Sequence, residues 1–164
     1  QLNNLNGIRF ILNYLMIEHA LRNKDINLKF VKSLPENKTE NYIMLKGKNA
    51  ILDINDYKTE EKYGTKEIKI SNEKFVNEIK KMKLDNGDYL FSMKNGSKIN
   101  NTSTFNDKIL NLTIDKLGQN KLVKIMIKDL LSNKSFDKLE QLSKDRGTSL
   151  DILLKSYNLH NGEK

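Results

Sequence analysis

The spacing of the hydrophobic residues changes twice along this 164-residue chain, and the changes restrict the folds open to it. From residue 8 to residue 21 apolar residues recur every three or four positions, which is the pattern of an amphipathic helix. Between 41 and 71 they alternate with polar residues, which predicts β-strands. After 71 the helical spacing returns and continues almost to the end of the chain. The pattern therefore predicts an α+β fold, mainly helical, with a small sheet inserted.

Within the central segment we predict a small three-stranded antiparallel sheet. Gly47-Lys48-Asn49 marks one turn, and the polar stretch 59–65, which contains Gly64, marks the other. Before the sheet, Asn23-Lys24-Asp25 forms a tight corner, and we expect a second short helix from Ile26 to Val31. The alternating apolar positions are Ile43, Leu45, Ala50, Leu52, Ile54, Ile68 and Ile70.

Five further helices follow the sheet. The first is capped by Ser71 or Asn72, and the last begins near Ser149, with Gly147 as the stop of the helix before it. The three between them span about 103–117, 121–131 and 135–146. No internal repeat and no long linker divides the chain, so we expect residues 1–164 to form one domain. Because the chain begins with Gln1 rather than Met, we expect it to be a fragment of a longer protein.

The composition favours a polyanionic partner. The net charge is +8 and the isoelectric point about 9.4, which would attract nucleic acid, although a merely well-solvated basic surface remains an alternative. The abundance of lysine and asparagine is typical of an AT-rich genome, which raises lysine content without a functional reason. There is no cysteine, and His19 and His160 form no metal-binding pattern, so we expect no metal and no cofactor. With no apolar run long enough to span a membrane and no signal peptide, an intracellular protein is expected.

Five segments resemble, in order and spacing, the catalytic domain of tyrosine recombinases, the phage-integrase class. The resemblance covers nearly the whole chain. Ala20–Ile26 resembles the apolar helix that ends in the family's first arginine, Asp56–Thr59 resembles the hairpin that carries its lysine, and Tyr89–Phe91 resembles the short segment that follows. Lys121–Lys124 falls where the family has His-x-x-Arg. Gly147–Ser149, with Tyr157 nine residues after Thr148, falls where the family has Gly-His-Ser and the tyrosine nucleophile.

The resemblance implies site-specific DNA recombination through a 3′-phosphotyrosyl intermediate, without ATP or a metal. It also implies double-stranded DNA as substrate, a tetramer assembled on that DNA, a separate DNA-binding domain before this one, and a mobile element or virus as the source. The catalytic residues that it implies are Tyr157 as nucleophile, Lys58 as general acid, and Arg22, Lys121, Lys124 and Thr148 around the phosphate.

The chain departs from the family at three of these positions. Lys124 stands where the family has its second arginine, Thr148 replaces a histidine, and Lys121 replaces the first histidine. The only other arginines are Arg9 and Arg146, and no shift of the alignment brings either to position 124. A lysine offers a point charge where arginine offers two parallel hydrogen bonds to a phosphate.

Three interpretations follow from these departures. In the first, the chain is a working recombinase with a weakened phosphate clamp, and retention of Arg22, Lys58 and Tyr157 favours it. In the second, it is a degenerate relative that binds DNA without strand cleavage. In the third, which lies outside this class, it is a basic helical module that binds nucleic acid without covalent chemistry, or binds a protein.

Overall fold

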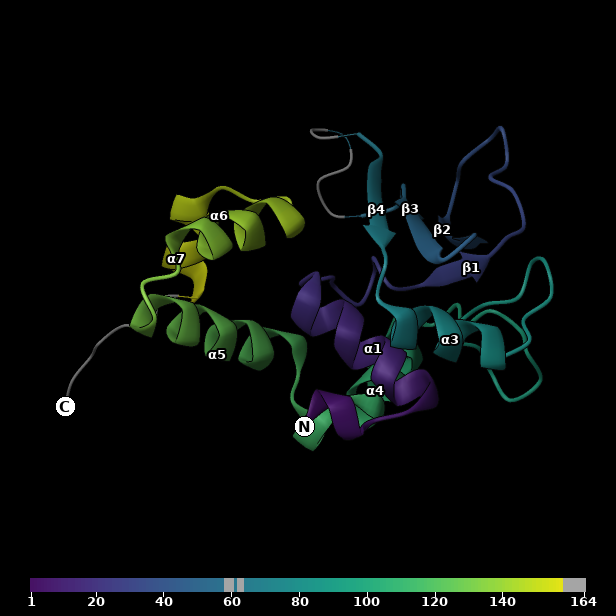
Figure 1. Cartoon of the computed structure of the whole chain (residues 1–164), viewed down its shortest axis with the longest axis horizontal. Helices are drawn as coiled ribbons and strands as arrows, with labels where there is room; N and C mark the ends of the chain where they lie inside the picture. The colour runs from purple at the N-terminus through teal and green to yellow at the C-terminus, as the bar shows by residue number, and fades with distance from the viewer. Residues whose placement is uncertain (58–60, 62–63, 158–164) are drawn as a thin grey trace.

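Four strands form one mixed sheet in the computed structural model, which describes residues 1–57, 61 and 64–157 (Figure 1). The side chains of residues 156 and 157 also lie outside the description, although their backbone belongs to the last helix. As the alternating pattern predicts, the second, third and fourth strands pair antiparallel. In sheet order the strands are β1 (Leu28–Phe30), β2 (Asn41–Lys46), β3 (Asn49–Ile54) and β4 (Lys66–Ile70).

The prediction of a three-stranded antiparallel sheet is wrong by one strand, because β1 pairs with β2 in parallel. We predicted a short helix there, yet Ile26, Leu28 and Phe30 alternate and fit a strand as well. On its other side β1 bonds a distant segment: the Phe30 amide donates to the Asp88 carbonyl (2.7 Å), and the Leu90 amide donates to the Leu28 carbonyl (2.9 Å). With partners on both edges, the extended backbone satisfies its polar groups better than one isolated helical turn would.

Three helices lie on one side of the sheet and enclose the main core with it: α3 contacts β3, α1 packs on α3, and α4 packs on α1 (Figure 1). They are α1 (Gly7–Glu18), α3 (Glu73–Lys81) and α4 (Thr102–Leu112). The predicted cap of α3 is confirmed, since the side chain of Asn72 accepts a hydrogen bond from the Phe75 amide at 2.9 Å. Fully buried side chains of this core include Phe10, Leu12, Leu15, Ile43, Leu52, Phe75 and Phe91.

The last three helices pack around a second, smaller core and stand to one side of the sheet (Figure 1). They are α5 (Gln119–Ser132), α6 (Phe136–Asp145) and α7 (Leu150–Tyr157), close to the predicted bounds. Among the described residues of the first half of the chain, Ala20, just after α1, is the one buried member of this core. In the other direction Leu122 of α5 packs against the main core, and polar groups lie beside these hydrophobic contacts. Buried members of the second core are Ala20, Val123, Ile127, Leu139, Leu142 and Leu153.

The remaining described helices are short. Two 3₁₀ turns, Leu2–Asn4 and Ile114–Lys116, precede α1 and follow α4. Across the described part of the chain, no helix combines the length and the apolar character that crossing a membrane requires.

A buried asparagine connects the turn after α1 to the end of β3. The side-chain amide of Asn41 is 2% exposed and donates to the carbonyls of Lys24, Asp25 and Asp56, at 3.1, 3.3 and 3.0 Å. Its oxygen accepts from the amides of Asn55 (2.8 Å) and Asp56 (2.7 Å). Asn41 therefore holds two loops together that no strand pairing joins.

Replacing Asn41 by alanine is expected to lower the free energy of unfolding by about 3 kcal/mol, because several backbone groups would lose a buried partner. Denaturant unfolding measures this loss, and Asn37→Ala, at an exposed position, should change the value by less than about 0.5 kcal/mol. Equal stability of the two variants would show that the Asn41 hydrogen bonds contribute nothing net.

Candidate functional site

The turn that follows α1 carries Arg22. Ala20 ends the helix in the left-handed conformation, with φ of +50°, and this reverses the chain direction. The Arg22 amide then donates to Oδ2 of Asp25 at 2.9 Å, and the Ile26 amide donates to the Arg22 carbonyl at 3.2 Å. These bonds fix the backbone of Arg22, while its side chain remains half-buried and open on one side.

The turn between α6 and α7 faces the first residue of β4. Gly147 adopts φ of +59°, and the Thr148 amide donates to the Ser143 carbonyl at 3.0 Å, which closes α6 as predicted. The Ser149 hydroxyl then accepts from the Ile152 amide at 3.3 Å, so Ser149 is the predicted N-cap of α7.

Lys66 bridges the sheet to this turn, because its Nζ donates to the carbonyl of Asp145. A pocket of about 340 Å³ opens at the bridge. Its lining comes from the hairpin, from β4 and from the α6–α7 turn. The lining residues are Tyr57, Thr65, Lys66, Lys144, Asp145, Gly147 and Thr148.

Charged groups gather behind this pocket. Asp25 and Arg146 are buried, at 4% and 3% exposure, and Nη1 of Arg146 donates to the Ala20 carbonyl at 3.3 Å. Arg22, Arg146 and Asp25 all interact electrostatically with Lys66. With Asp145 included, three cations face two carboxylates, so the cluster is positive by one charge when all are ionised.

Burial governs protonation in this cluster. It lowers the pKa of Lys66 below that of an ordinary lysine; Arg22 and Arg146 lower it further, while Asp145 and Asp25 oppose the shift. Burial also raises the pKa of Asp25, against the stabilising effect of the hydrogen bond from the Arg22 amide. A lysine whose pKa is lowered in this way releases its proton more readily than an exposed one, which is what a general acid requires.

The structure brings only some of the predicted residues together. Arg22 and Thr148 lie at this site, on the two sides of the narrow junction. Lys121 and Lys124 lie on the exposed face of α5, and neither contacts the cluster through a hydrogen bond or ion pair to a described residue. The start of α5 is nevertheless close to Arg22, because the Gln119 side chain donates to the Leu21 carbonyl at 3.3 Å.

Two predicted residues have no described side chain. Tyr157 is the last residue of α7, so its backbone follows from the Ser149 cap and the length of that helix. The position predicted for Lys58 lies outside the described residues, next to Tyr57.

The sequence motifs assign no role to three residues of the cluster: Asp25, Lys66 and Arg146. Asp25 stands three residues after Arg22, a spacing that fits a carboxylate capping the turn, and this signal was available. No local sequence feature distinguishes Lys66 from the other lysines of this basic chain. Arg146 directly precedes the Gly147 turn, but the family resemblance gives it no role.

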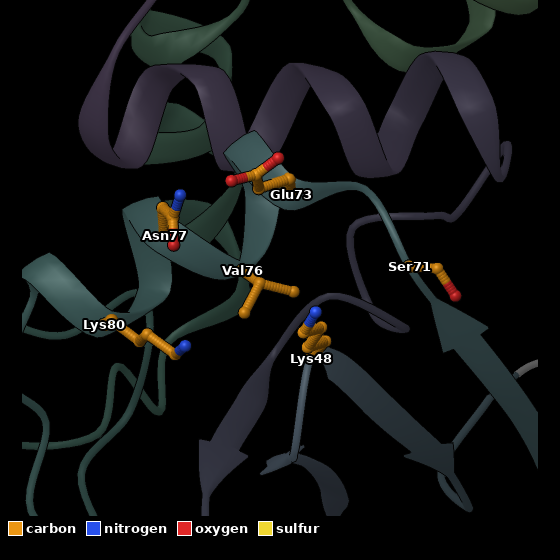
Figure 2. A pocket seen from close by; sticks show the side chains of 6 residues that line it. All are labelled: Lys48, Ser71, Glu73, Val76, Asn77 and Lys80. Carbon is orange, nitrogen blue, oxygen red and sulfur yellow. The ribbon is translucent and has the colours of Figure 1, made fainter.

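A second pocket, of about 390 Å³, lies where β4 ends and α3 begins (Figure 2). Lys48 enters it from the β2–β3 turn and Lys80 from α3, and the carboxylate of Glu73 stands at the same rim. These charged side chains are exposed, and none of the predicted catalytic residues lines the pocket. We assign it no function.

No protein-family model matches the chain, and searches of curated proteins and of solved structures give no match either. Among the described residues, no group of three or more histidine, aspartate or glutamate side chains is placed to hold a metal ion.

Proposed function

We propose that this protein cleaves and rejoins DNA strands as a site-specific recombinase of the tyrosine class. One observation supports this above the others: Lys66 and Thr148 line a pocket beside the turn that leads into α7, the charge of Arg22 acts on Lys66, and α7 ends at Tyr157. A positive pocket fits a phosphodiester, and the helix that starts at its edge carries the proposed nucleophile.

In the proposed reaction the phenol oxygen of Tyr157 attacks the phosphorus of a backbone phosphodiester and gives up its proton to a water molecule. The bond from phosphorus to the 5′-oxygen breaks, and a 3′-phosphotyrosyl ester remains. The 5′-oxygen leaves as a hydroxyl, after it takes a proton from a lysine ammonium group. Because the ester keeps the bond energy, a second 5′-hydroxyl can reverse the step without ATP.

The surrounding cations would stabilise the charge that develops on the non-bridging oxygens. Arg22 can offer a planar fork to two of these oxygens, and Thr148 can donate a neutral hydrogen bond. One such donor is commonly worth about 3–4 kcal/mol in the transition state. Lys66 is the proton donor that the site geometry favours, whereas Lys58 is the one that the family resemblance implies.

The competing interpretation is a DNA-binding protein that keeps this architecture without cleavage. The exposed positions of Lys121 and Lys124 on α5 favour it, since both are free to contact a phosphate backbone without entering the pocket. Double-stranded DNA is the partner in either case, and assembly of a tetramer on that DNA belongs to the recombinase proposal.

The deciding experiment traps the covalent intermediate. A nicked duplex lets the short 5′-end diffuse away after cleavage, so that an adduct accumulates and migrates slowly on a denaturing gel. An adduct formed by the unmodified domain supports the recombinase. DNA binding that weakens steeply with salt, without any adduct, supports the non-cleaving alternative.

Changing Lys124 to arginine is expected to raise the yield of adduct about tenfold. The gain should fall short of the 10²–10³-fold effect of a whole donor, because lysine already supplies one positive charge. The initial rate of adduct formation measures it. Lys128→Arg, one turn further along the exposed face of α5, serves as the control. The same change in both variants would show that position 124 does not face the phosphate.

A further inference from the structure

Arg146 is an arginine placed where packing alone would favour an apolar side chain. It is 3% exposed, at the end of α6, beside the second core that contains Leu142 and Leu153. Burying a guanidinium costs several kcal/mol unless charged and hydrogen-bonding partners offset the loss of water. An apolar residue of similar size would avoid that cost.

The contacts of Arg146 lead to the proposed catalytic site. Nη1 donates to the carbonyl of Ala20, which is 126 residues away in the chain and two residues before Arg22. The charge of Arg146 also acts on Asp25 and on Lys66. One buried side chain thus connects the α6–α7 turn to the turn that carries Arg22.

This connection crosses the junction between the two cores. Of the first half of the chain, as far as the structure describes it, Ala20 is the one buried member of the second core, and Leu122 of α5 packs against the main core. Apart from Arg146, polar links across the junction run from Gln119 to Leu21 and from Lys66 to Asp145. The link between Lys66 and Asp145 also lines the pocket, and Arg146 lies next to the pocket residues Asp145 and Gly147 in the chain.

We propose that Arg146 is a positioning residue of the strand-cleavage site, which holds the turn bearing Arg22 against the α6–α7 turn and supplies a fixed positive charge behind Lys66. This inference rests on the proposed function. Arg146 does not touch DNA, since it is buried, so it acts through Arg22 and Lys66. The site then has a second guanidinium, which comes from the end of α6 and acts in addition to the lysine at the aligned position 124 on α5.

The test compares Arg146→Met with Arg146→Lys. The control is Arg9→Met, because Arg9 also donates to a backbone carbonyl at 3.3 Å, that of Leu112, but lies far from the pocket lining. Arg146→Met is expected to bind duplex DNA like the parent and to form adduct about 10- to 100-fold more slowly. Loss of a residue that orients a functional side chain without touching the substrate typically has an effect of this size, as measured for residues that orient metal ligands. Arg146→Lys should recover part of the rate, and Arg9→Met should cleave like the parent.

A second readout needs no DNA chemistry. Trinitrobenzenesulfonate reacts with lysine amines only in their neutral form. The extent of labelling of the peptide that contains Lys66, followed by mass spectrometry as a function of pH, therefore reports the pKa of that group. The charges that face Lys66 are Asp145, Asp25, Arg22 and Arg146, with His19 nearby. Removal of one cation in Arg146→Met should move the labelling midpoint to higher pH, and Arg146→Lys should keep the parental midpoint.

The two readouts separate the inference from the proposed function. If the unmodified domain forms no adduct, the recombinase proposal fails, and a shifted midpoint still supports a positioning role for Arg146 at this cluster. A midpoint unchanged in Arg146→Met, or parental cleavage by that variant, would overturn the inference. If Arg146→Met does not fold, Arg146→Lys decides: slower cleavage per folded molecule with the parental midpoint supports the inference, and parental cleavage contradicts it.

Discussion

Replacing Tyr157 by phenylalanine is expected to abolish the covalent DNA adduct and to leave the affinity for duplex DNA unchanged. The substitution removes one oxygen at the last residue of α7. Loss of a nucleophile typically slows such a reaction by four or more powers of ten, since no other group takes its place. Binding depends on the positive surface, which the substitution does not alter. Adduct yield on a denaturing gel and a binding titration at fixed salt measure the two effects.

Tyr57 provides the comparison, because a second phenol lines the same pocket. Its hydroxyl donates to the Gly64 carbonyl at 2.6 Å, so it holds the hairpin in place. Tyr57→Phe is expected to lose about 1 kcal/mol of stability and to keep forming adduct. If Tyr57→Phe lost the adduct and Tyr157→Phe kept it, the nucleophile would be misassigned. If neither variant lost it, the link to DNA would not be a phosphotyrosine of either residue.

Local patterns predicted most of the helices and the antiparallel part of the sheet. The spacing of apolar residues places α1, and the cap at Asn72 places α3, because helix formation and capping depend on neighbours a few positions away. The strand β1 was missed because its state depends on distant partners. Leu28 pairs with Asn41, and the backbone of Phe30 bonds Asp88, contacts that no local pattern contains.

The same distinction applies to the site. The sequence singles out Arg22 and Thr148 because each lies in a short motif with a recognisable turn. It does not single out Lys66 and Arg146, because they join the cluster through contacts between residues 79 and 126 positions apart. The charged cluster lies between two parts of the chain that meet only in the folded protein, so the residue types alone do not reveal which charges come together.

Substituting methionine for Lys66 is expected to slow adduct formation by about 10²–10⁴-fold, the usual contribution of a general acid. Methionine keeps an unbranched chain of similar length and removes the proton. A substrate with sulfur in place of the 5′-bridging oxygen should remove the defect, because a thiol has a pKa near 8.5 and leaves as an anion without protonation. Comparing cleavage rates of the oxygen and sulfur substrates therefore tests specifically for proton donation.

Lys58→Met distinguishes the two candidate lysines. If Lys66 is the acid, only Lys66→Met should be rescued by sulfur; rescue of Lys58→Met alone would assign the role to Lys58. The pH dependence gives a second criterion. A general acid works in its protonated form, and burial lowers the pKa of Lys66, so cleavage of the oxygen substrate should decline with rising pH earlier than an exposed lysine would allow. Cleavage of the sulfur substrate should show no such decline, because the step that needs the proton is then absent.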